Sequence, residues 1–236
     1  MPHPNTGQAV NDHEVLAAVL QVRAGSLQVL LWERAREPHA HRWSLPGGRL
    51  RPDEDVEASI KRQLEEKVDV RQLSHVEQLA VFSAPDRRPG ARVIATAFLG
   101  LVPAGNDPAV PEDTRWHPVD ALPRTAFDHE SIVRRARDRL RAKLSYTNLG
   151  FALAPPEFTI SALRELYSAA LGYRVSATNL QRVLSRRGLL EPTGETAPPG
   201  KAGGRPAALF SFVRRSMTVT DPFAVLRPPN RIRERS

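Results

Sequence analysis

Residues suited to binding phosphate gather between Pro46 and Lys67. Pro46-Gly47-Gly48 is a strong break in regular structure, and its glycines allow a backbone to come close to a ligand. A helix is predicted to begin at residues 52–55, where acidic side chains suit the positive end of the helix dipole. The cations that could meet a diphosphate there, together with backbone NH groups near the helix start, are Arg49, Arg62 and Lys67. The alternative is structural, with Arg62 pairing only with Glu54 or Glu66.

The spacing in this stretch resembles the Nudix hydrolase box. Gly48 is followed after five residues by Glu54, and after seven more by Arg62. Leu64, Glu66 and Val70 also match, and so do the flanking residues 43–47, 122–123 and 127–129. The resemblance covers residues 13–144 and implies a fold of the α/β class, a Nudix α/β/α sandwich around a mixed sheet.

The departures from this box bear on activity. Active Nudix enzymes carry three Glu side chains on one face of the helix, which hold Mg²⁺ against a diphosphate. The corresponding positions here are Gln63, Glu66 and Lys67, and Asp69 replaces a glycine. Because an amide is no anionic ligand and an ammonium repels a dication, we expect no metal site, no catalytic residues and no enzyme. The alternative is an active hydrolase of ADP-ribose or another nucleoside diphosphate derivative. The expected effector-binding residues are Gly48, Arg49, Arg62, Glu66 and Lys67.

A second kind of chemistry is offered by residues 176–188. Ser176 suits the N-cap of a helix, and Gly188 suits the position after its end. Leu180, Val183 and Leu184 recur at helical spacing, so one face packs inward. A solvated surface helix is the alternative reading. The opposite face carries polar and guanidinium groups of the kind that contact bases and phosphates, namely Thr178, Asn179, Gln181, Arg182, Ser185 and Arg186.

The neighbouring elements favour a winged helix. An apolar stripe over residues 163–171 predicts a preceding helix, and a short turn joins it to the next one. Downstream, a strand over residues 208–213 closes a hairpin that forms the wing. Its tip offers Lys201 and Arg205 to a phosphate backbone or a minor groove.

The composition limits the other possibilities. The chain of 236 residues has a net charge of +8 and no cysteine, which excludes disulfides, thiolate metal sites and a cysteine nucleophile. Residues 151–236 hold 13 Lys and Arg against 6 Asp and Glu, whereas residues 1–150 hold 21 against 20. This asymmetry fits a sensor joined to a binder of polyanions, with chance as the alternative. No signal peptide and no apolar run near the ~18 residues of a membrane span occur, so we expect a soluble, cytoplasmic protein.

The remaining sequence predicts the elements that hold these residues in place. Strands are expected at residues 14–22, 27–32, 76–82 and 92–102, where apolar and β-branched residues run together. A helix is expected at residues 128–144. We interpret it as the joint between domains, with a solvated face or an additional DNA contact as alternatives. Its outer face carries Arg134, Arg135, Arg137, Arg139, Arg141 and Lys143.

Together the two halves resemble the Nudix-related transcriptional regulators of the NrtR family. The second half does so through residues 163–172, 179–182, 188–194 and 204–207. The resemblance implies a homodimeric repressor of genes for NAD biosynthesis or salvage, which binds a palindromic operator and responds to ADP-ribose or a related nucleotide without a cofactor. Binding of RNA, or of DNA without sequence preference, is a further alternative. The expected organisation is a flexible tail (1–12), an effector-sensing Nudix-like domain (13–150), a winged-helix DNA-binding domain (151–220) and a basic tail (221–236).

Overall fold

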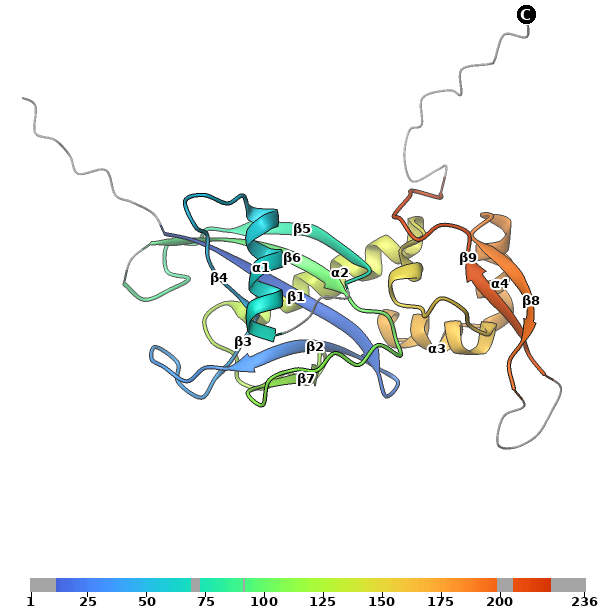
Figure 1. The fold of residues 1–236 in the computed structure, drawn as a ribbon, viewed down its shortest axis with the longest axis horizontal. Coiled ribbons are helices and arrows are strands. Elements are labelled where there is room, and N and C mark those ends of the chain that lie inside the picture. The colour runs from blue at the N-terminus through green and yellow to red at the C-terminus, as the bar shows by residue number, and fades with distance from the viewer. Residues whose placement is uncertain (1–11, 69–72, 91, 199–205, 222–236) are drawn as a thin grey trace, which may run out of the picture. The chain divides into compact units, whose positions relative to one another are not determined.

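The computed structural model describes residues 12–68, 73–90, 92–198 and 206–221 (Figure 1). The chain divides into two compact units, Met1–Arg139 and Leu140–Ser236. The division falls inside helix α2, His129–Tyr146, so this helix is the connection between the units, as the sequence analysis expects. Several predictions concern positions outside the described residues: Lys201, Arg205, Asp69, Val70, the side chain of Lys67, and the tails over residues 1–11 and 222–236.

The first unit is built on a mixed β-sheet. Strand β1 pairs in parallel with β6 and antiparallel with β2 and β4, while β5 pairs antiparallel with β6, and β3 and β7 pair antiparallel with β2. The order across the sheet is β3-β2-β1-β6-β5. The four strands predicted from sequence are confirmed. Within the described part of the chain, the sheet comprises β1 (Asp12–Arg23), β2 (Ser26–Glu33), β3 (Trp43–Ser44), β4 (Gly47–Arg49), β5 (His75–Phe82), β6 (Val93–Leu101) and β7 (Thr114–Pro118).

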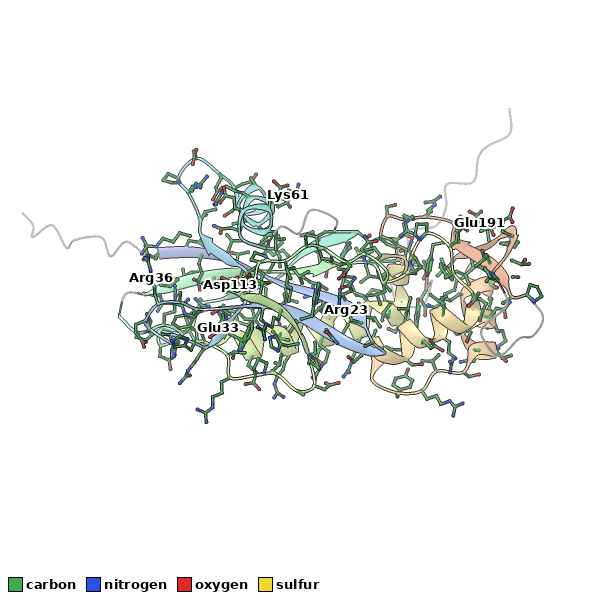
Figure 2. The ribbon with its side chains drawn as sticks, turned by 60° about the horizontal axis from the view of Figure 1, so that its bottom comes forward. Arg23, Glu33, Arg36, Lys61, Asp113 and Glu191 are labelled. Atoms are coloured by element: carbon green, nitrogen blue, oxygen red, sulfur yellow. The ribbon has the colours of Figure 1, made fainter. Side chains whose placement is uncertain are left out.

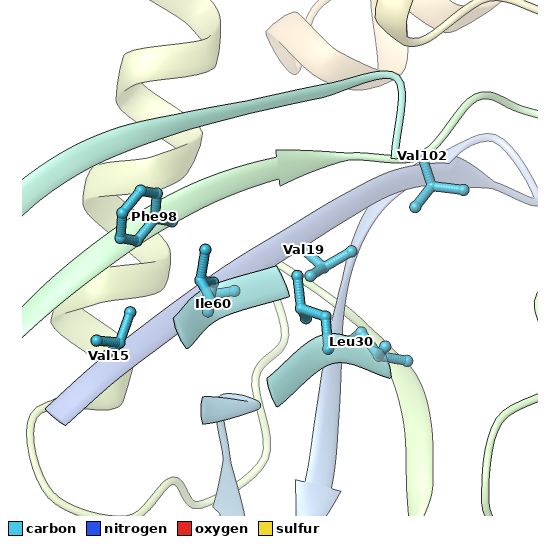
Figure 3. Close-up of a cluster of buried hydrophobic side chains, with 8 residues drawn as sticks. Val15, Val19, Leu30, Ile60, Phe98 and Val102 are labelled. Carbon is cyan, nitrogen blue, oxygen red and sulfur yellow. The ribbon is translucent and has the colours of Figure 1, made fainter. Parts of the chain in front are cut away.

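Helices cover both faces of this sheet, because its central strands are apolar on both sides. Val15, Ala17 and Val19 of β1 pack with Ile60 and Leu64 of helix α1, Val56–Val68 (Figure 3). The alternate residues of β1 are equally buried on the other face, where α2 lies behind the sheet in Figure 3. The α/β/α sandwich around a mixed sheet is therefore confirmed.

The two glycines of the Pro-Gly-Gly stretch, which the sequence analysis describes as a break in regular structure, belong to a short strand. Residues Gly47–Arg49 form β4, in which Gly48 lies opposite Val15 of β1. A Cβ atom on Gly47, whose φ is 152°, would collide with the carbonyl oxygen of Val15. The close approach that the sequence analysis expects toward a ligand is thus, in the structure, an approach of β4 to β1. Strands β3 and β7 are likewise absent from the sequence prediction, since runs of 2 and 5 residues carry too little periodicity.

The second unit has the elements of a winged helix. A 3₁₀ helix η1 (Leu149–Ala152) leads to helices α3 (Ile160–Leu171) and α4 (Ala177–Arg186), followed by strands β8 (Leu190–Thr196) and β9 (Ala208–Phe212). The Thr159 hydroxyl caps α3, and Gly172 ends it with a φ of 80°. Phe158 exchanges backbone hydrogen bonds with Phe210 and so adds a third segment to the wing sheet. The predicted pair of helices and the strand after them are confirmed.

Candidate DNA-binding face and effector site

Helix α4 presents the polar face that the sequence analysis assigns to DNA. Its N-cap is Ser176, whose hydroxyl accepts a hydrogen bond from the Asn179 amide at 3.4 Å, while Leu180 and Leu184 are buried. Arg182 Nη2 donates to Asn179 Oδ1 at 2.8 Å, which holds this guanidinium along the helix surface. All six predicted DNA-contact residues of the helix are exposed, namely Thr178, Asn179, Gln181, Arg182, Ser185 and Arg186.

Arg187, the next residue, has an internal role that sequence reasoning missed. Its Nη1 donates to the Ser145 carbonyl oxygen at 2.8 Å, and its Nη2 pairs with Asp221 at 3.1 Å. Its side chain is 20% exposed. Because Ser145 belongs to α2 and Asp221 follows β9, Arg187 fixes the end of α4 to two other segments of the second unit. Arg186 and Arg187 are the same residue type and differ only in the side of the helix from which they project. The sequence therefore could not show that Arg187 has a structural role.

The wing is a hairpin of β8 and β9 that carries acidic side chains on its described strands. Glu191, labelled in Figure 2, accepts a hydrogen bond from the Ser211 hydroxyl at 3.2 Å. The described residues from 190 to 198 and from 206 to 212 include no Lys or Arg. Cationic contacts from the wing therefore depend on Lys201 and Arg205, which lie outside the described residues.

In the first unit, Arg62 of α1 holds two carboxylates. Its Nε and Nη2 donate to Glu54 at 2.8 and 2.6 Å, and its Nη1 donates to Glu66 at 3.1 Å. The hydrogen bonds from Arg62 lower the pKa of Glu54 to about 2, and the same bonds raise the pKa of Arg62. The geometry supports the structural alternative for Arg62, because its donors are largely used within the chain.

Gln63 occupies a catalytic Glu position of the Nudix box and lies against Gly48. It is 4% exposed, its Nε2 is 3.4 Å from the carbonyl oxygen of Arg49, and its Oε1 has no hydrogen-bond partner in the described part of the chain. A Cβ atom on Gly48 would meet this amide. Mg²⁺ prefers anionic oxygen ligands in octahedral geometry, and this site offers one neutral oxygen beside carboxylates that Arg62 already holds. The donor set does not fit Mg²⁺.

The four predicted effector-binding residues that the structure describes in full, Gly48, Arg49, Arg62 and Glu66, do not form one cluster. Arg62 and Glu66 are bonded to each other, and Gly48 faces Gln63. Arg49 points elsewhere, pairing with Asp12 at 2.7 Å on an exposed surface. Among the residues that the structure describes, no group of three or more His, Asp or Glu side chains could hold a metal ion.

A buried ion-pair cluster lies at the start of α2, where sequence reasoning assigned no role. Arg87 pairs with Glu14 at 2.6 Å and with Asp128 at 2.8 Å, and its side chain is 1% exposed. Next to it, His129 is buried and its Nδ1 accepts a hydrogen bond from the Leu45 amide at 3.0 Å. Burial, followed by the nearby charge of Arg87, lowers the pKa of His129 to about 3, so the imidazole is neutral. The cluster joins β1, the β5–β6 loop and the start of α2.

Comparisons with known proteins match both units. A model of the NUDIX domain matches residues 12–136, and a model of the NrtR DNA-binding winged helix domain matches residues 150–212. The ADPR responsive transcriptional repressor NtrR of Acinetobacter baylyi is 30% identical over 205 residues, which cover 83% of this chain and 79% of that protein. This chain belongs to the NrtR family.

Solved structures agree with this membership. The crystal structure of Shewanella oneidensis NrtR complexed with a 27mer DNA matches with a TM-score of 0.71 and 28% identity, over 84% of this chain and 92% of that one. The NUDIX domain of the same NrtR, complexed with ADP ribose, matches with a TM-score of 0.51 and 27% identity, over 58% and 94% of the two chains. An ADP-ribose pyrophosphatase of Methanocaldococcus jannaschii is 32% identical over 113 residues, 45% of this chain and 64% of that enzyme. A hydrolase is thus also a relative of this NrtR-family chain.

Two arginines of α2, Arg139 and Arg141, are each bonded within their own unit. Arg139 pairs with Glu77 at 3.2 Å and donates to the Leu79 carbonyl oxygen at 3.1 Å. Arg141 donates to the Ala170 carbonyl oxygen at 3.1 Å. These bonds give Arg139 and Arg141 structural partners, so these two side chains supply no evidence for an additional DNA contact. None of the described helices is long and apolar enough to cross a membrane.

Proposed function

We propose that this chain is a transcriptional repressor of NAD biosynthesis or salvage genes that responds to ADP-ribose or a related nucleotide. The observation that carries the proposal is the exposed polar face of α4, which sits within a winged helix of the NrtR type. Short polar side chains and two exposed arginine side chains at helical spacing suit base edges and phosphates in a major groove. The relative from Acinetobacter baylyi, whose name describes an ADPR responsive repressor, supports the regulatory role.

ADP-ribose is the proposed effector and no cofactor is required. The support is the cocrystal of the Shewanella oneidensis NUDIX domain with ADP ribose, to which the first unit is similar. The nucleotide regulates DNA binding if it binds one conformation of the protein better than another. Its role is therefore that of a ligand that shifts an equilibrium, and it is not consumed.

We further propose a homodimer on a palindromic operator. A helix-turn-helix reads a short half-site, and two copies related by a twofold axis read two half-sites about one helical turn of DNA apart, or a multiple of that spacing. Sedimentation of the full chain, alone and with operator DNA, measures the number of copies per duplex. Two copies per palindrome are expected, and one copy per palindrome would contradict the proposal.

The central experiment is a gel-shift titration of the full chain on DNA upstream of NAD-synthesis genes, with and without ADP-ribose. We expect saturable binding that survives competitor DNA and changes when ADP-ribose is added. Binding that depends steeply on salt and not on sequence would point to a nonspecific binder of DNA or RNA. Specific binding without a nucleotide response would retain the DNA role and reject ADP-ribose as the effector.

A second candidate function is hydrolysis of ADP-ribose, because Glu54 and Glu66 remain in the Nudix box and a pyrophosphatase is a relative. The Arg62 pairings and the neutral, buried Gln63 argue against it. The test is release of AMP from ADP-ribose with Mg²⁺ present. We expect none above a no-protein control. Release that Glu66→Gln abolishes would establish the enzyme.

A further inference from the structure

Two guanidiniums join the ends of three helices in the second unit. Arg141, near the end of α2, donates through Nε to the Ala170 carbonyl oxygen at 3.1 Å, in the last turn of α3. Arg187, the C-cap residue of α4, donates through Nη1 to the Ser145 carbonyl oxygen at 2.8 Å, in the last turn of α2. The end of α2 is therefore bonded to both helices of the helix-turn-helix.

Both bonds use carbonyl groups that an α-helix leaves free. The last four carbonyl oxygens of a helix have no amide partner within it, and they form the negative end of its dipole. A guanidinium is a charged, planar donor, so its hydrogen bonds are stronger and more directional than those of a neutral group. Apolar contacts have no preferred direction, so they allow helices to slide past each other more easily than these bonds do.

Gly172 lets Arg141 approach the helix-turn-helix closely. This glycine ends α3 with a φ of 80°, and a Cβ atom on it would lie 2.5 Å from Nη2 of Arg141. It is also the first residue after α3, in the connection that leads to α4. Arg141 is thus in contact with the turn itself, so a displacement of α2 acts directly on the segment that sets the direction of α4.

The segment after β9, residues 214–221, completes this joint. The Asp221 amide donates to the Tyr146 carbonyl oxygen at 3.2 Å, and the Asp221 carboxylate pairs with Arg187 at 3.1 Å. Asn148, which is buried just beyond the end of α2, bonds the backbone of the same segment through both atoms of its side-chain amide. The end of α2 and the end of α4 are therefore attached to one shared segment.

Helix α2 is also attached within the first unit. Arg139 pairs there with Glu77 of β5 at 3.2 Å. Because Arg139 and Arg141 are two positions apart, they project about 200° apart around the helix. The helix runs without a break across the boundary between the units, so a rotation or shift of its first part reaches its last turns.

We propose that Arg141 and Arg187 are positioning residues that transmit the state of the first unit to the DNA-reading helix α4. The inference rests on the proposed function, since it takes ADP-ribose in the first unit to change operator affinity. A ligand does so only by favouring one arrangement of the protein over another. When α2 moves, the two guanidiniums carry α3 and α4 with it. Without these bonds the winged helix still folds on its apolar core, but α2 no longer directs it.

The test measures operator affinity by fluorescence anisotropy, without ADP-ribose and with saturating ADP-ribose. The larger affinity divided by the smaller is the coupling factor. Arg141→Gln and Arg187→Gln probe the two bonds, Arg141→Lys is the conservative replacement, and Arg135→Gln is the matched control at an exposed arginine of the same helix. Isothermal titration gives the ADP-ribose affinity without DNA, and thermal unfolding shows whether each variant is folded. If Arg187→Gln does not fold, Arg141→Gln decides alone.

We expect a coupling factor of about five or more in the unaltered chain and in Arg135→Gln, and a factor below about two in Arg141→Gln and Arg187→Gln. The ADP-ribose affinity and the operator affinity without nucleotide should each stay within about three-fold of the unaltered chain, because neither binding surface is changed. Arg141→Lys should recover part of the factor, since an ammonium still meets the Ala170 carbonyl oxygen.

Three results would contradict these expectations in different ways. Weaker operator binding with an unchanged coupling factor would mean that the guanidiniums only support the fold, which overturns the inference and leaves the proposed function standing. An equal loss of coupling in Arg135→Gln would overturn the assignment to Arg141 and Arg187. An unaltered chain whose operator binding ignores ADP-ribose rejects the proposed effector, and the inference is rejected with it.

Discussion

The arginines of this chain carry unrelated tasks, and the surroundings of each side chain decide which. Arg62 and Arg87 each bridge two carboxylates inside the first unit. Arg182 and Arg186 are exposed on α4, where the nearest bond of Arg182 is to a side chain of its own helix. A guanidinium with all its donors used supports the fold, whereas one left in solvent is available to a phosphate or a base.

Replacement of Arg182 by Ala tests the DNA-contact face directly. We expect operator binding to weaken by about 1–3 kcal/mol if the side chain meets a base or phosphate, with unfolding unchanged. Fluorescence anisotropy with labelled operator gives the affinity. Lys61→Ala, which removes a cation from the exposed side of α1 (Figure 2), should bind like the unaltered chain. Equal affinity of Arg182→Ala and Lys61→Ala would remove Arg182 from the interface.

The low pKa of the buried His129 predicts that the folded chain loses stability in mild acid. Its folded-state pKa of about 3 lies below the unfolded value, so the unfolded chain takes up a proton between these two values and the folded chain does not. Stability is therefore complete above the unfolded pKa of about 6.5 and falls as the pH decreases, by about 2 kcal/mol between pH 7.5 and 5. Urea unfolding at both pH values measures it.

The control for this pH effect is His129→Asn, which keeps an acceptor for the Leu45 amide and removes the titrating ring. Its loss of stability between pH 7.5 and 5 should be smaller than that of the unaltered chain by most of the amount assigned to His129. An identical pH dependence in both proteins would show that other groups cause it.

Between elements, Arg187 makes the bonds that attach α4 to the end of α2. Arg187→Ala should lower the free energy of unfolding by about 1–2 kcal/mol, because it removes two charge-assisted hydrogen bonds from a mostly buried side chain. The matched variant Arg186→Ala should change unfolding by less than about 0.5 kcal/mol and weaken operator binding instead. Urea unfolding and DNA titration of the pair separate the two roles. Reversed effects would mean that the phase of α4 is wrong.

The contact between η1 and α3 allows a second test of how the elements pack against each other. A Cβ atom on Gly150 would collide with the ring and hydroxyl of Tyr167, which is buried and whose Oη has no described hydrogen-bond partner. Gly150→Ala should cost about 1–3 kcal/mol of stability through overpacking. Tyr167→Phe should cost little or nothing, since it removes an unsatisfied hydroxyl. The double variant should recover part of the loss, and simple additivity in a double-mutant cycle would contradict the contact.

For the whole molecule, thermodynamic linkage makes a prediction that needs no knowledge of how the units are arranged. If ADP-ribose changes operator affinity by some factor, operator DNA must change ADP-ribose affinity by the same factor. Couplings of roughly 5–150-fold are typical of allosteric proteins. Titration of ADP-ribose into the chain with and without saturating operator measures the second factor. If the two affinity factors differ, the two experiments do not measure the same species. The nucleotide would then also bind a DNA-free form of the protein that the gel shift does not contain.

The parts of this molecule that could be predicted are those with long periodic patterns or fixed motif spacing. The stripe of α3, the caps of α4 and the box from Gly48 to Glu66 all belong to this class. Strands β3, β4 and β7 were not predictable, because each is short and is held in place by pairing with a longer strand. The cluster of Glu14, Arg87 and Asp128 could not be predicted for a related reason, because the bonded residues lie 41 or more positions apart in the sequence.

Helix α2 has a consequence for how such a protein can be inherited and altered. The boundary between the two units falls within its 18 residues, where no loop offers a place to cut. Ile132, Val133 and Ala136 are buried before the boundary, and Leu140 and Leu144 are buried after it. Recombination that exchanged one half at this boundary would have to keep both buried sets in the same helical phase. The two units are therefore expected to be inherited together and to diverge by substitution, not by recombination between them.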